Sequence, residues 1–255
     1  MNIPINKFKR YLKNNINKFS FHERRWSIRE RLRLLKFDNT CRDEECVILG
    51  NGPSLHGFDF NRLKGKKVFA LNKFYLAYEN TDFRASYHVI VNRFVIEQSK
   101  DFILNLNYPV FLSYDNAGGW LPKKKNIYYI RRGGFYLDFQ PHPYFYTCEG
   151  YTVTYVALQL AYWMGFKTVY LLGVDHNFIY EGKPNEEMIM NGDDINHFHP
   201  GYFKNQKWQN PDLEASEAAY SLANFIYTRG GRRIYNATEG TKLDIFPKID
   251  IETFL

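Results

Sequence analysis

The stretch Cys46-Val47-Ile48-Leu49-Gly50-Asn51-Gly52-Pro53-Ser54-Leu55 passes from a short apolar run directly into glycine, asparagine, glycine and proline. The apolar run is too short for a helix, so it predicts a buried strand that leads into a tight turn. Its two glycines permit backbone angles and close approaches that a Cβ would forbid. At the edge of an α/β sheet, such a turn presents backbone N–H groups and the side chains of Asn51 and Ser54 to a ligand, and we expect phosphate there. A plain strand-to-helix connection is the alternative, because the spacing matches neither the dinucleotide fingerprint nor the P-loop.

The composition predicts a globular chain. Of its 255 residues, 45% are hydrophobic and 18% are aromatic, which is enough to build a sizeable core. The three cysteines have neither disulfide nor metal-site spacing, which favours a reducing compartment. No apolar run approaches the roughly 20 residues that span a bilayer, and the N-terminus lacks the apolar core of a signal peptide. We therefore expect a cytoplasmic protein.

The positive charge is concentrated at the N-terminus. Residues 1–37 hold eleven Lys and Arg against two Glu, so this segment carries +9 and the remainder carries −2 of the total +7. Its apolar residues recur at helical spacing, which predicts one or two basic amphipathic helices in an extension over residues 1–45. Such helices bind anionic lipid, so we expect the protein to lie peripherally on the inner face of the cytoplasmic membrane. Packing on the core or a contact in a homo-oligomer is the alternative, and no nucleic acid is expected because the body lacks a basic groove.

From residue 46 to residue 255 the chain alternates strand-like and helix-like stretches. This alternation predicts an α/β, Rossmann-like domain with a mostly parallel sheet and helices on both faces. A helix is expected over Thr152–Gly165, where nearly the whole circumference is apolar, and a longer amphipathic helix over Asp212–Arg229. The expected strands begin at Cys46 and then cover Lys67–Leu71, Tyr87–Val91, Pro109–Ser113, Ile127–Ile130, Thr168–Gly173 and Arg232–Asn236.

Polar residues follow several of these strands. Asn51, Asn72 and Asn92 each stand where a strand ends, and Asp175 follows the strand Thr168–Gly173. Because the carboxyl ends of parallel strands meet at one edge, we expect these side chains to converge on a ligand. An asparagine offers an acceptor and a donor, which suits a base, a ribose or a sugar, although each one alone is also a common turn residue.

The start of the helix at Thr152 is a further candidate anion site. Free N–H groups and the positive end of the helix dipole lie there, beside the hydroxyls of Thr152 and Thr154. The aromatic, proline-rich segment 131–149 is expected either to wall a substrate pocket or to form a packed loop.

A polar segment over about residues 178–210 has the composition of a lid over the site. It contains His197 and His199, and a neutral imidazole can take a proton from a hydroxyl nucleophile. Two histidines without further ligands do not make a metal motif, so no metal and no cofactor are predicted. Either histidine is a candidate base.

These motifs resemble the bacterial sialyltransferases of the Campylobacter lipooligosaccharide type. The resemblance covers roughly Cys46 to Phe246 and is carried by the turn Gly50–Leu55, the strand ends at Asn72 and Asn92, the strand end Gly173-Val174-Asp175 and the histidine segment. The turn Asn236-Ala237-Thr238-Glu239-Gly240 is more similar to the related family of motility accessory factor glycosyltransferases and archaeal 6-hydroxymethylpterin diphosphokinases.

The resemblance implies roles for particular residues. It implies that the nucleotide-sugar donor is held by a set drawn from several strand ends and from the start of a helix, namely Gly50, Asn51, Gly52, Ser54, Asn72, Asn92 and Thr152 or Thr154. It implies a histidine base, which is His199 with His197 as the second choice, and Tyr180 and Tyr202 as candidates to ease departure of the phosphate. The sequence departs from the sialyltransferases at Gly150–Thr154, which leaves the sialic acid donor open.

The expected function is therefore transfer of a sugar from a nucleotide donor, plausibly a CMP-activated nonulosonate, to a hydroxyl of a cell-surface glycan or lipid-linked acceptor. The catalytic candidates are His199, His197 and Asp175. An ATP-dependent pterin diphosphokinase is the rival and would need Mg²⁺ on carboxylates such as Asp175 and Glu239. A non-catalytic scaffold on the membrane is the third alternative.

Overall fold

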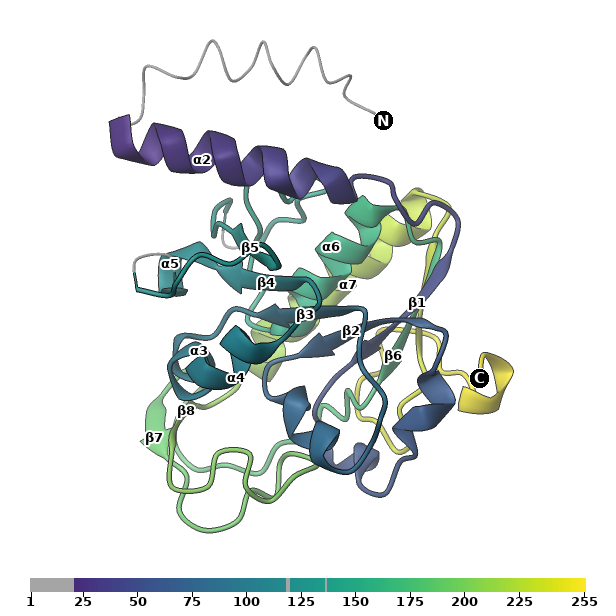
Figure 1. The fold of residues 1–255 in the computed structure, drawn as a ribbon. Helices are drawn as coiled ribbons and strands as arrows, with labels where there is room; N and C mark the ends of the chain where they lie inside the picture. The colour runs from purple at the N-terminus through teal and green to yellow at the C-terminus, as the bar shows by residue number, and fades with distance from the viewer. Residues whose placement is uncertain (1–20, 118–119, 136) are drawn as a thin grey trace.

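The computed structural model describes residues 21–117, 120–135 and 137–255, and at its centre lies a seven-stranded sheet in which all neighbouring strands run parallel (Figure 1). The order across this sheet is β5-β4-β3-β2-β1-β6-β9. The strands are β1 Glu45–Leu49, β2 Lys67–Leu71, β3 Tyr87–Ile90, β4 Val110–Ser113, β5 Ile127–Ile130, β6 Thr168–Leu172 and β9 Arg233–Asn236. Each lies within one residue of the strand expected from sequence, and the α/β, Rossmann-like fold class is confirmed.

The strand order reverses beside β1. The chain runs outward from β1 through β2, β3, β4 and β5, and then returns to the other side of β1 with β6 and β9. At such a switch point, the connections leave the two neighbouring strands in opposite directions and open a crevice at their carboxyl ends. Gly50 follows β1 and Gly173 follows β6. The turn Gly50–Leu55 therefore lies at this crevice.

Helices cover both faces of the sheet, as expected. On one face lie α6 (Val153–Met164) and α7 (Leu213–Arg229), which pack on each other and on the side chains of β1 and β6 that point to that side. On the other face lie α3 (Arg93–Gln98), α4 (Lys100–Asn105), the lid segment over residues 178–210, and a series of 3₁₀ turns. The short helix α5 is Tyr114–Ala117, and the 3₁₀ turns are Pro53–Leu55, Phe60–Leu63, Phe74–Glu79 and Ile251–Thr253.

Both long helices begin and end where their capping residues predict. Thr152 caps α6 by accepting a hydrogen bond from Thr154 N, and Gly165 ends the helix with a left-handed φ of 99°. Asp212 caps α7 through the N–H of Ala215. Because α6 is apolar on nearly all sides, it is buried between the sheet, α7 and the segment 131–149.

The aromatic segment 131–149 packs on α6 rather than walling the pocket. Phe139 makes edge contacts with Tyr155 and Tyr162, and the buried amide of Gln159 bonds to the backbone of Gln140 and Cys148. No described residue of this segment lines the pocket at the switch point. Of the two alternatives, a pocket wall and a packed loop, the structure shows the packed loop.

Helix α2 (Phe21–Leu34), continued by a 3₁₀ turn at Leu35–Phe37, lies against the edge strand β5. Arg33 donates to the backbone carbonyls of Lys125 and Ile127 and pairs with buried Glu30, so the inner side of this helix is packed on the body. Residues 1–20 lie outside the described part of the chain, so the amphipathic helix expected there is not assessed. Among the described residues, no helix has the length and apolarity to cross a membrane.

Lid segment 178–210 holds a small antiparallel pair, β7 (Glu187–Ile189) and β8 (Lys207–Gln209). Its middle part contacts the turn Gly50–Leu55, because Phe198 N donates to Asn51 O over 2.9 Å. It is also held by Lys73, whose buried ammonium donates to Tyr202 O and Gln206 Oε1, each over 2.6 Å. Residues 73 and 202 are far apart in sequence, so these hydrogen bonds are tertiary contacts between the body and the lid segment.

Candidate active site at the β1–β6 switch point

A pocket opens at the switch point, between the carboxyl ends of β1, β2 and β6, the first turns of α6 and α7, and the lid segment. Its volume is about 140 Å³. Ligand pockets usually measure roughly 300–1,000 Å³, so this volume is smaller than that of a typical ligand pocket. The predicted site residues that line it are Gly50, Asn51, Gly52, Asn72, Thr152, Thr154, Asp175, His197 and Tyr202.

Two asparagines that line this pocket have buried carbonyl oxygens without a partner. Asn51 Nδ2 donates to Leu71 O over 3.1 Å, while Asn51 Oδ1 is buried without a partner. Asn72 Oδ1 is likewise buried without a partner. A buried acceptor without a partner costs about 1–3 kcal/mol, so these two oxygens favour a ligand that donates hydrogen bonds to them.

Asn92, the third asparagine, lies elsewhere. It caps α3, where its Oδ1 accepts from Phe94 N over 2.9 Å and from Val95 N over 3.3 Å, and it does not line the pocket. Two of the three asparagines therefore meet, and the third has the capping role that asparagine commonly takes at a helix start.

The turn at Gly50–Ser54 is bonded to the neighbouring strand end. Gly50 N donates to Leu172 O and Gly52 N donates to Gly173 O, over 2.8 and 2.9 Å. A Cβ on Gly52 would lie 1.8 Å from Asp175 Oδ2, so glycine is required by this close approach. Three of the amides expected to hold phosphate, those of residues 50, 52 and 54, are thus already donating within the protein.

Asp175 fixes that turn. Its Oδ1 accepts from Ser54 N over 2.9 Å and its Oδ2 accepts from Ser54 Oγ over 2.7 Å. Burial raises the pKa of this carboxyl, and the two bonds from Ser54 and the nearby charge of His197 act in the opposite direction. Both oxygens are occupied, which makes Asp175 a positioning residue at the pocket edge, and Ser54 holds it there without lining the pocket itself.

His197 has the environment of a general base. Its Nδ1 lies 2.8 Å from Asp194 Oδ2, and the Asp194 side chain is fully buried. A carboxylate only accepts, so Nδ1 carries the hydrogen and Nε2 is left as the acceptor of a ring that lines the pocket. The imidazole is stacked on Tyr202 with ring centres 3.9 Å apart and planes 2° apart, so its orientation is fixed.

His199 and Tyr180 lie outside the pocket lining. His199 Nδ1 accepts from Gly201 N over 3.1 Å, and Tyr180 donates its hydroxyl to Pro211 O over 3.1 Å. Tyr202 reaches the pocket, but its hydroxyl accepts from Lys73 N, and burial raises its pKa. The preference for His199 over His197 therefore has no support in the geometry.

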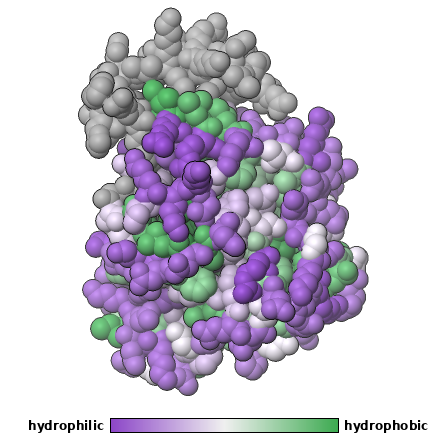
Figure 2. All heavy atoms as spheres, in the orientation of Figure 1, coloured by the Kyte–Doolittle hydropathy of each residue, from purple (hydrophilic) through white to green (hydrophobic). Residues whose placement is uncertain are grey.

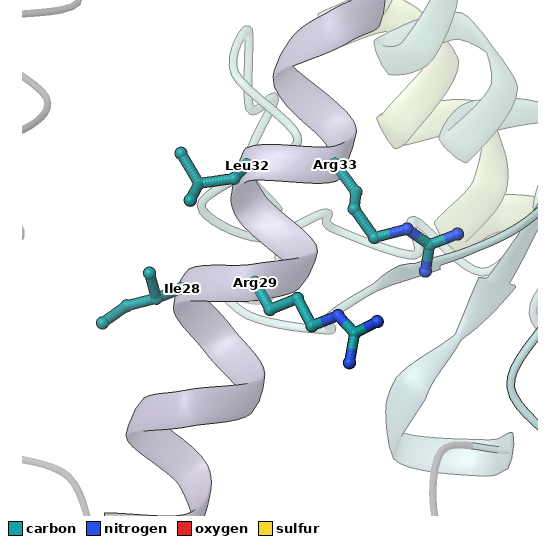
Figure 3. Close-up of a pocket in the computed structure, with 4 residues that line it drawn as sticks. All are labelled: Ile28, Arg29, Leu32 and Arg33. Atoms are coloured by element: carbon teal, nitrogen blue, oxygen red, sulfur yellow. The ribbon is translucent and has the colours of Figure 1, made fainter. Parts of the chain in front are cut away.

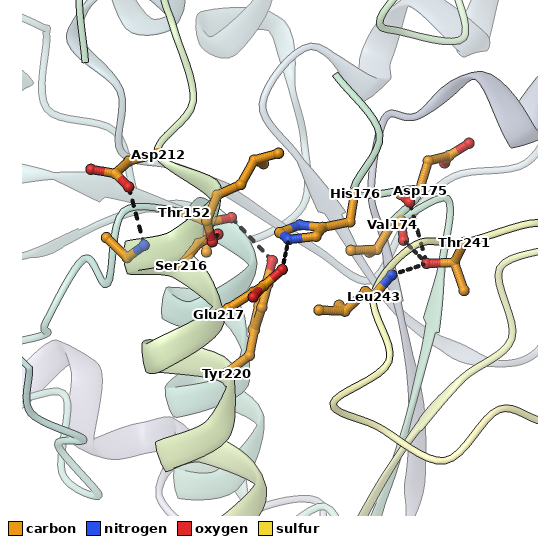
Figure 4. Close-up of polar contacts among 12 residues, drawn as sticks. Thr152, Val174, Asp175, His176, Asp212, Ser216, Glu217, Tyr220, Thr241 and Leu243 are labelled. Atoms are coloured by element: carbon orange, nitrogen blue, oxygen red, sulfur yellow. Dashed lines mark hydrogen bonds and ion pairs between the residues drawn. The ribbon is translucent and has the colours of Figure 1, made fainter. Parts of the chain in front are cut away.

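A second histidine–carboxylate pair stands at the pocket, and sequence reasoning gave it no role (Figure 4). His176 Nε2 lies 2.9 Å from Glu217 Oε1 of α7, and its ring packs against Tyr220, whose hydroxyl is 3.3 Å from Thr152 Oγ1. No spacing in the sequence relates residue 176 to residue 217. By contrast, Asp194 stands three residues before His197, and that spacing was an available signal.

The carboxylates named for a magnesium site do not meet at the pocket. Glu239 is exposed and is not among the lining residues, and Asp175 is engaged by Ser54. Within the described residues, no group of three or more His, Cys, Asp and Glu side chains is arranged to hold a metal ion.

A second hollow lies far from this chemistry, on the outer side of α2. Figure 3 shows Ile28 and Leu32 pointing to one side of the helix and Arg29 and Arg33 pointing to the other. Figure 2 shows the apolar patch over α2 bordered by hydrophilic side chains, and Leu32 is 53% exposed. The exposed residues of α2 thus include the apolar Leu32 and the basic Arg29.

The model of the 6-hydroxymethylpterin diphosphokinase MptE-like family matches residues 24–181, which includes β1, the opening turn and the end of β6. The chain belongs to this MptE-like family. No curated protein matches it. Among solved structures, it is similar to the sialyltransferase CstII from Campylobacter jejuni in complex with a substrate analogue, CMP-3FNeuAc, with 19% identity, a TM-score of 0.46, and coverage of 81% of this chain and 86% of that chain. This likeness is too distant to carry an argument about function.

Proposed function

We propose that this MptE-like protein is a glycosyltransferase that moves a sugar from a nucleotide donor to a hydroxyl acceptor. The observation that carries the proposal is the His197–Asp194 pair on the pocket wall, facing a site with two unused asparagine oxygens. An oriented imidazole whose Nε2 is left as an acceptor at the pocket suits proton removal from a hydroxyl. The donor that we propose is a CMP-activated nonulosonate or a similar acidic sugar.

In this scheme His197 is the base. Its Nε2 takes the proton of the acceptor hydroxyl while the acceptor oxygen forms a bond to the anomeric carbon. The bond between that carbon and the donor phosphate breaks, and its electron pair leaves with the nucleotide. Asp194 accepts from Nδ1 throughout and stabilises the imidazolium that forms.

Asn51 and Asn72 would hold the donor. Their free carbonyl oxygens can accept from ribose hydroxyls or from an exocyclic amine such as that of cytosine. The first turn of α6, with Thr152 and Thr154 at the pocket, offers its positive dipole end to the anionic part of the donor. This division puts the neutral part of the nucleotide near β1 and β2 and its phosphate near α6.

Thermal shift with nucleotides tests the class of donor. We expect CMP, or another nucleoside monophosphate, to raise the melting temperature without added metal, because a ligand that binds only the folded state stabilises it. A shift with ATP and Mg²⁺ alone would contradict the proposal.

The base is tested by exchange of the histidine. His197→Asn should lower kcat by about 10²–10⁴ with a nucleotide sugar that the thermal shift identifies, and leave nucleotide affinity near the wild-type value. His199→Asn, which changes a histidine outside the pocket, is the matched control and should keep its turnover. Equal losses in the two variants would remove His197 as the base.

A pyrophosphoryl transfer from ATP to a pterin is the second candidate, because the family description names that activity. It would require Mg²⁺, and the carboxylates near the pocket are engaged or distant, as described above. Formation of AMP from ATP and 6-hydroxymethylpterin in the presence of Mg²⁺ would establish it in place of sugar transfer.

The acceptor that we propose is a cell-surface glycan or a lipid-linked sugar at the cytoplasmic side of the membrane. Support comes from the charge of residues 1–37 and from the exposed apolar and basic side of α2. A basic surface with an exposed leucine binds anionic bilayers by its charge and by its apolar area. The membrane then brings enzyme and acceptor together.

A further inference from the structure

His176 is the second ionisable group of the pocket, and its backbone is held in an unusual conformation. Its φ is 55°, in the left-handed region, which is uncommon for residues other than glycine, although histidine is among the types enriched there. Its side chain is only 6% exposed, yet the residue lines the pocket. Strained residues at a pocket wall commonly serve the ligand, because the surrounding structure must hold them there.

One nitrogen of the His176 ring is hydrogen-bonded and the other has no partner among the described residues. Nε2 lies 2.9 Å from Glu217 Oε1, whereas Nδ1 has no partner among the described residues. When the ring is neutral and Nε2 donates to the carboxylate, Nδ1 is an acceptor; when the ring is protonated, Nδ1 is a donor. An anion at Nδ1 therefore selects the protonated ring.

The position of His176 fits the phosphate of the donor. The amides of Gly50, Gly52 and Ser54 are occupied, so the opening turn has few N–H groups left for an anion. The ring of His176 packs on Tyr220, which also contacts Thr152 at the start of α6 (Figure 4). His176 thus stands where the helix N-terminus already favours negative charge.

We propose that His176, positioned by Glu217, binds the phosphate of the nucleotide donor as an imidazolium. This inference rests on the proposed function and assigns the leaving-group side of its site. The Nδ1–H would donate to a phosphate oxygen and stabilise the charge that grows on it as the bond to the anomeric carbon breaks. His197 and His176 then have separate roles, one as the base and one as the partner of the phosphate.

Several charged or titratable groups surround His176, and the test must separate them. They are Glu217, Asp212 and Tyr220 of α7 and its cap, Asp175 at the end of β6, His197 and Asp194 of the lid segment, and Lys242, whose N–H donates to Asp175 O. Of these, only Glu217 is bonded to the imidazole. A change in proton uptake that depends on residue 176 therefore isolates the proposed contact.

The probe is the 5′-methyl phosphate of cytidine, uridine, adenosine or guanosine, whichever binds. Each is a phosphodiester with one charge that stays constant between pH 6 and 9. Calorimetry in buffers of different ionisation enthalpy measures the protons taken up with the ligand. We expect uptake that approaches one proton per ligand toward the upper end of this range, and affinity that falls by up to tenfold per pH unit there.

His176→Asn should abolish that proton uptake and weaken the phosphodiester at least tenfold at pH 7. Asparagine tolerates a left-handed backbone, so the variant keeps the conformation of the loop, which its melting temperature checks. The nucleoside without phosphate is the matched ligand and should bind the variant and the wild type equally. Glu217→Gln should keep the affinity for the nucleoside and reduce the proton uptake.

Two results would overturn the inference. One concerns only the contact of His176 with the phosphate, and the other concerns the nucleotide donor itself. If a phosphodiester binds the wild type with no proton uptake and binds His176→Asn equally well, His176 does not contact the phosphate and the proposed function stands. If none of the four probes binds the wild type, the nucleotide donor itself fails, and the inference fails with it.

Discussion

At the scale of single residues, Asp175 gives the clearest link between burial and pH. Its pKa is raised mainly by burial, so the folded state favours the protonated acid. The stability that it contributes is present below the ordinary value near 3.8 and is lost as the pH rises through the raised pKa. Asp175→Asn keeps an acceptor for Ser54 N and offers a donor to Ser54 Oγ. We therefore expect the unfolding free energy of this variant, relative to the wild type, to increase from pH 3.5 to pH 7, as measured by urea unfolding.

The control for this experiment is Asp244→Asn. Asp244 is exposed, and its pKa is lowered by its hydrogen bond to Lys248. The unfolding free energy of this variant, relative to the wild type, should therefore change with pH in the opposite direction. A relative stability of Asp175→Asn that falls toward pH 7 would show that the carboxylate, once ionised, is well accommodated by Ser54.

The sequence located the polar residues of the site better than it described their bonds. Asn51, Asn72 and Asp175 follow strand ends, and a parallel sheet brings such positions together, so pattern alone could place them. The bonds of Gly52 N and Glu217 depend on which strands and helices are neighbours. That information comes only from the strand order and the packing of α7. The choice between His197 and His199 needed the same information.

At the scale of elements, the lid segment and the body are joined by Lys73. Burial lowers the pKa of its ammonium to about 8, and the charge of Asp194 acts in the opposite direction. The folded state therefore binds fewer protons than the unfolded state between pH 8 and 10.5, and this residue makes stability rise with pH in that window. The rise amounts to on the order of 3 kcal/mol at most, since one pKa unit is about 1.4 kcal/mol.

Lys73→Met should remove that rise and loosen the lid, because Tyr202 O and Gln206 Oε1 lose their donor. We expect the wild type to gain stability relative to the variant from pH 8 to pH 10.5 in urea unfolding. Hydrogen exchange should speed up in the lid segment, residues 178–210, and stay unchanged in α7. Unchanged exchange in the lid segment would show that Lys73 does not hold it closed.

The strands and the long helices follow from local pattern, and the segment 131–149 does not. Strand and helix periodicity, the caps Thr152 and Asp212 and the stop at Gly165 are all local signals. The aromatic segment lacks a period, and its place is set by Gln159, whose amide bonds to backbone groups on both sides of it. Nothing in the sequence around Gln159 indicates that its side chain bonds to segment 131–149.

At the scale of the whole molecule, the basic N-terminal residues and the candidate pocket are separate. The pocket lies at the β1–β6 switch point, whereas the basic residues gather in the extension that precedes β1 and in α2 at the β5 edge. Figure 1 shows α2 along one end of the sheet, away from the lid segment. This separation lets the α2 side lie on a membrane while the lid segment stays free to open.

Sedimentation with lipid vesicles tests that orientation. We expect the full chain to bind vesicles that contain phosphatidylserine, to bind phosphatidylcholine vesicles weakly, and to lose binding as salt increases, because screening weakens each Lys or Arg contact. Leu32→Glu replaces an exposed apolar side chain of the α2 hollow with a negative charge and should weaken binding about tenfold or more. Phe225→Glu on α7 changes a side chain of similar exposure, 57% against 53%, and should bind as the wild type does. If both variants lose binding equally, general charge rather than the α2 side brings the protein to the bilayer.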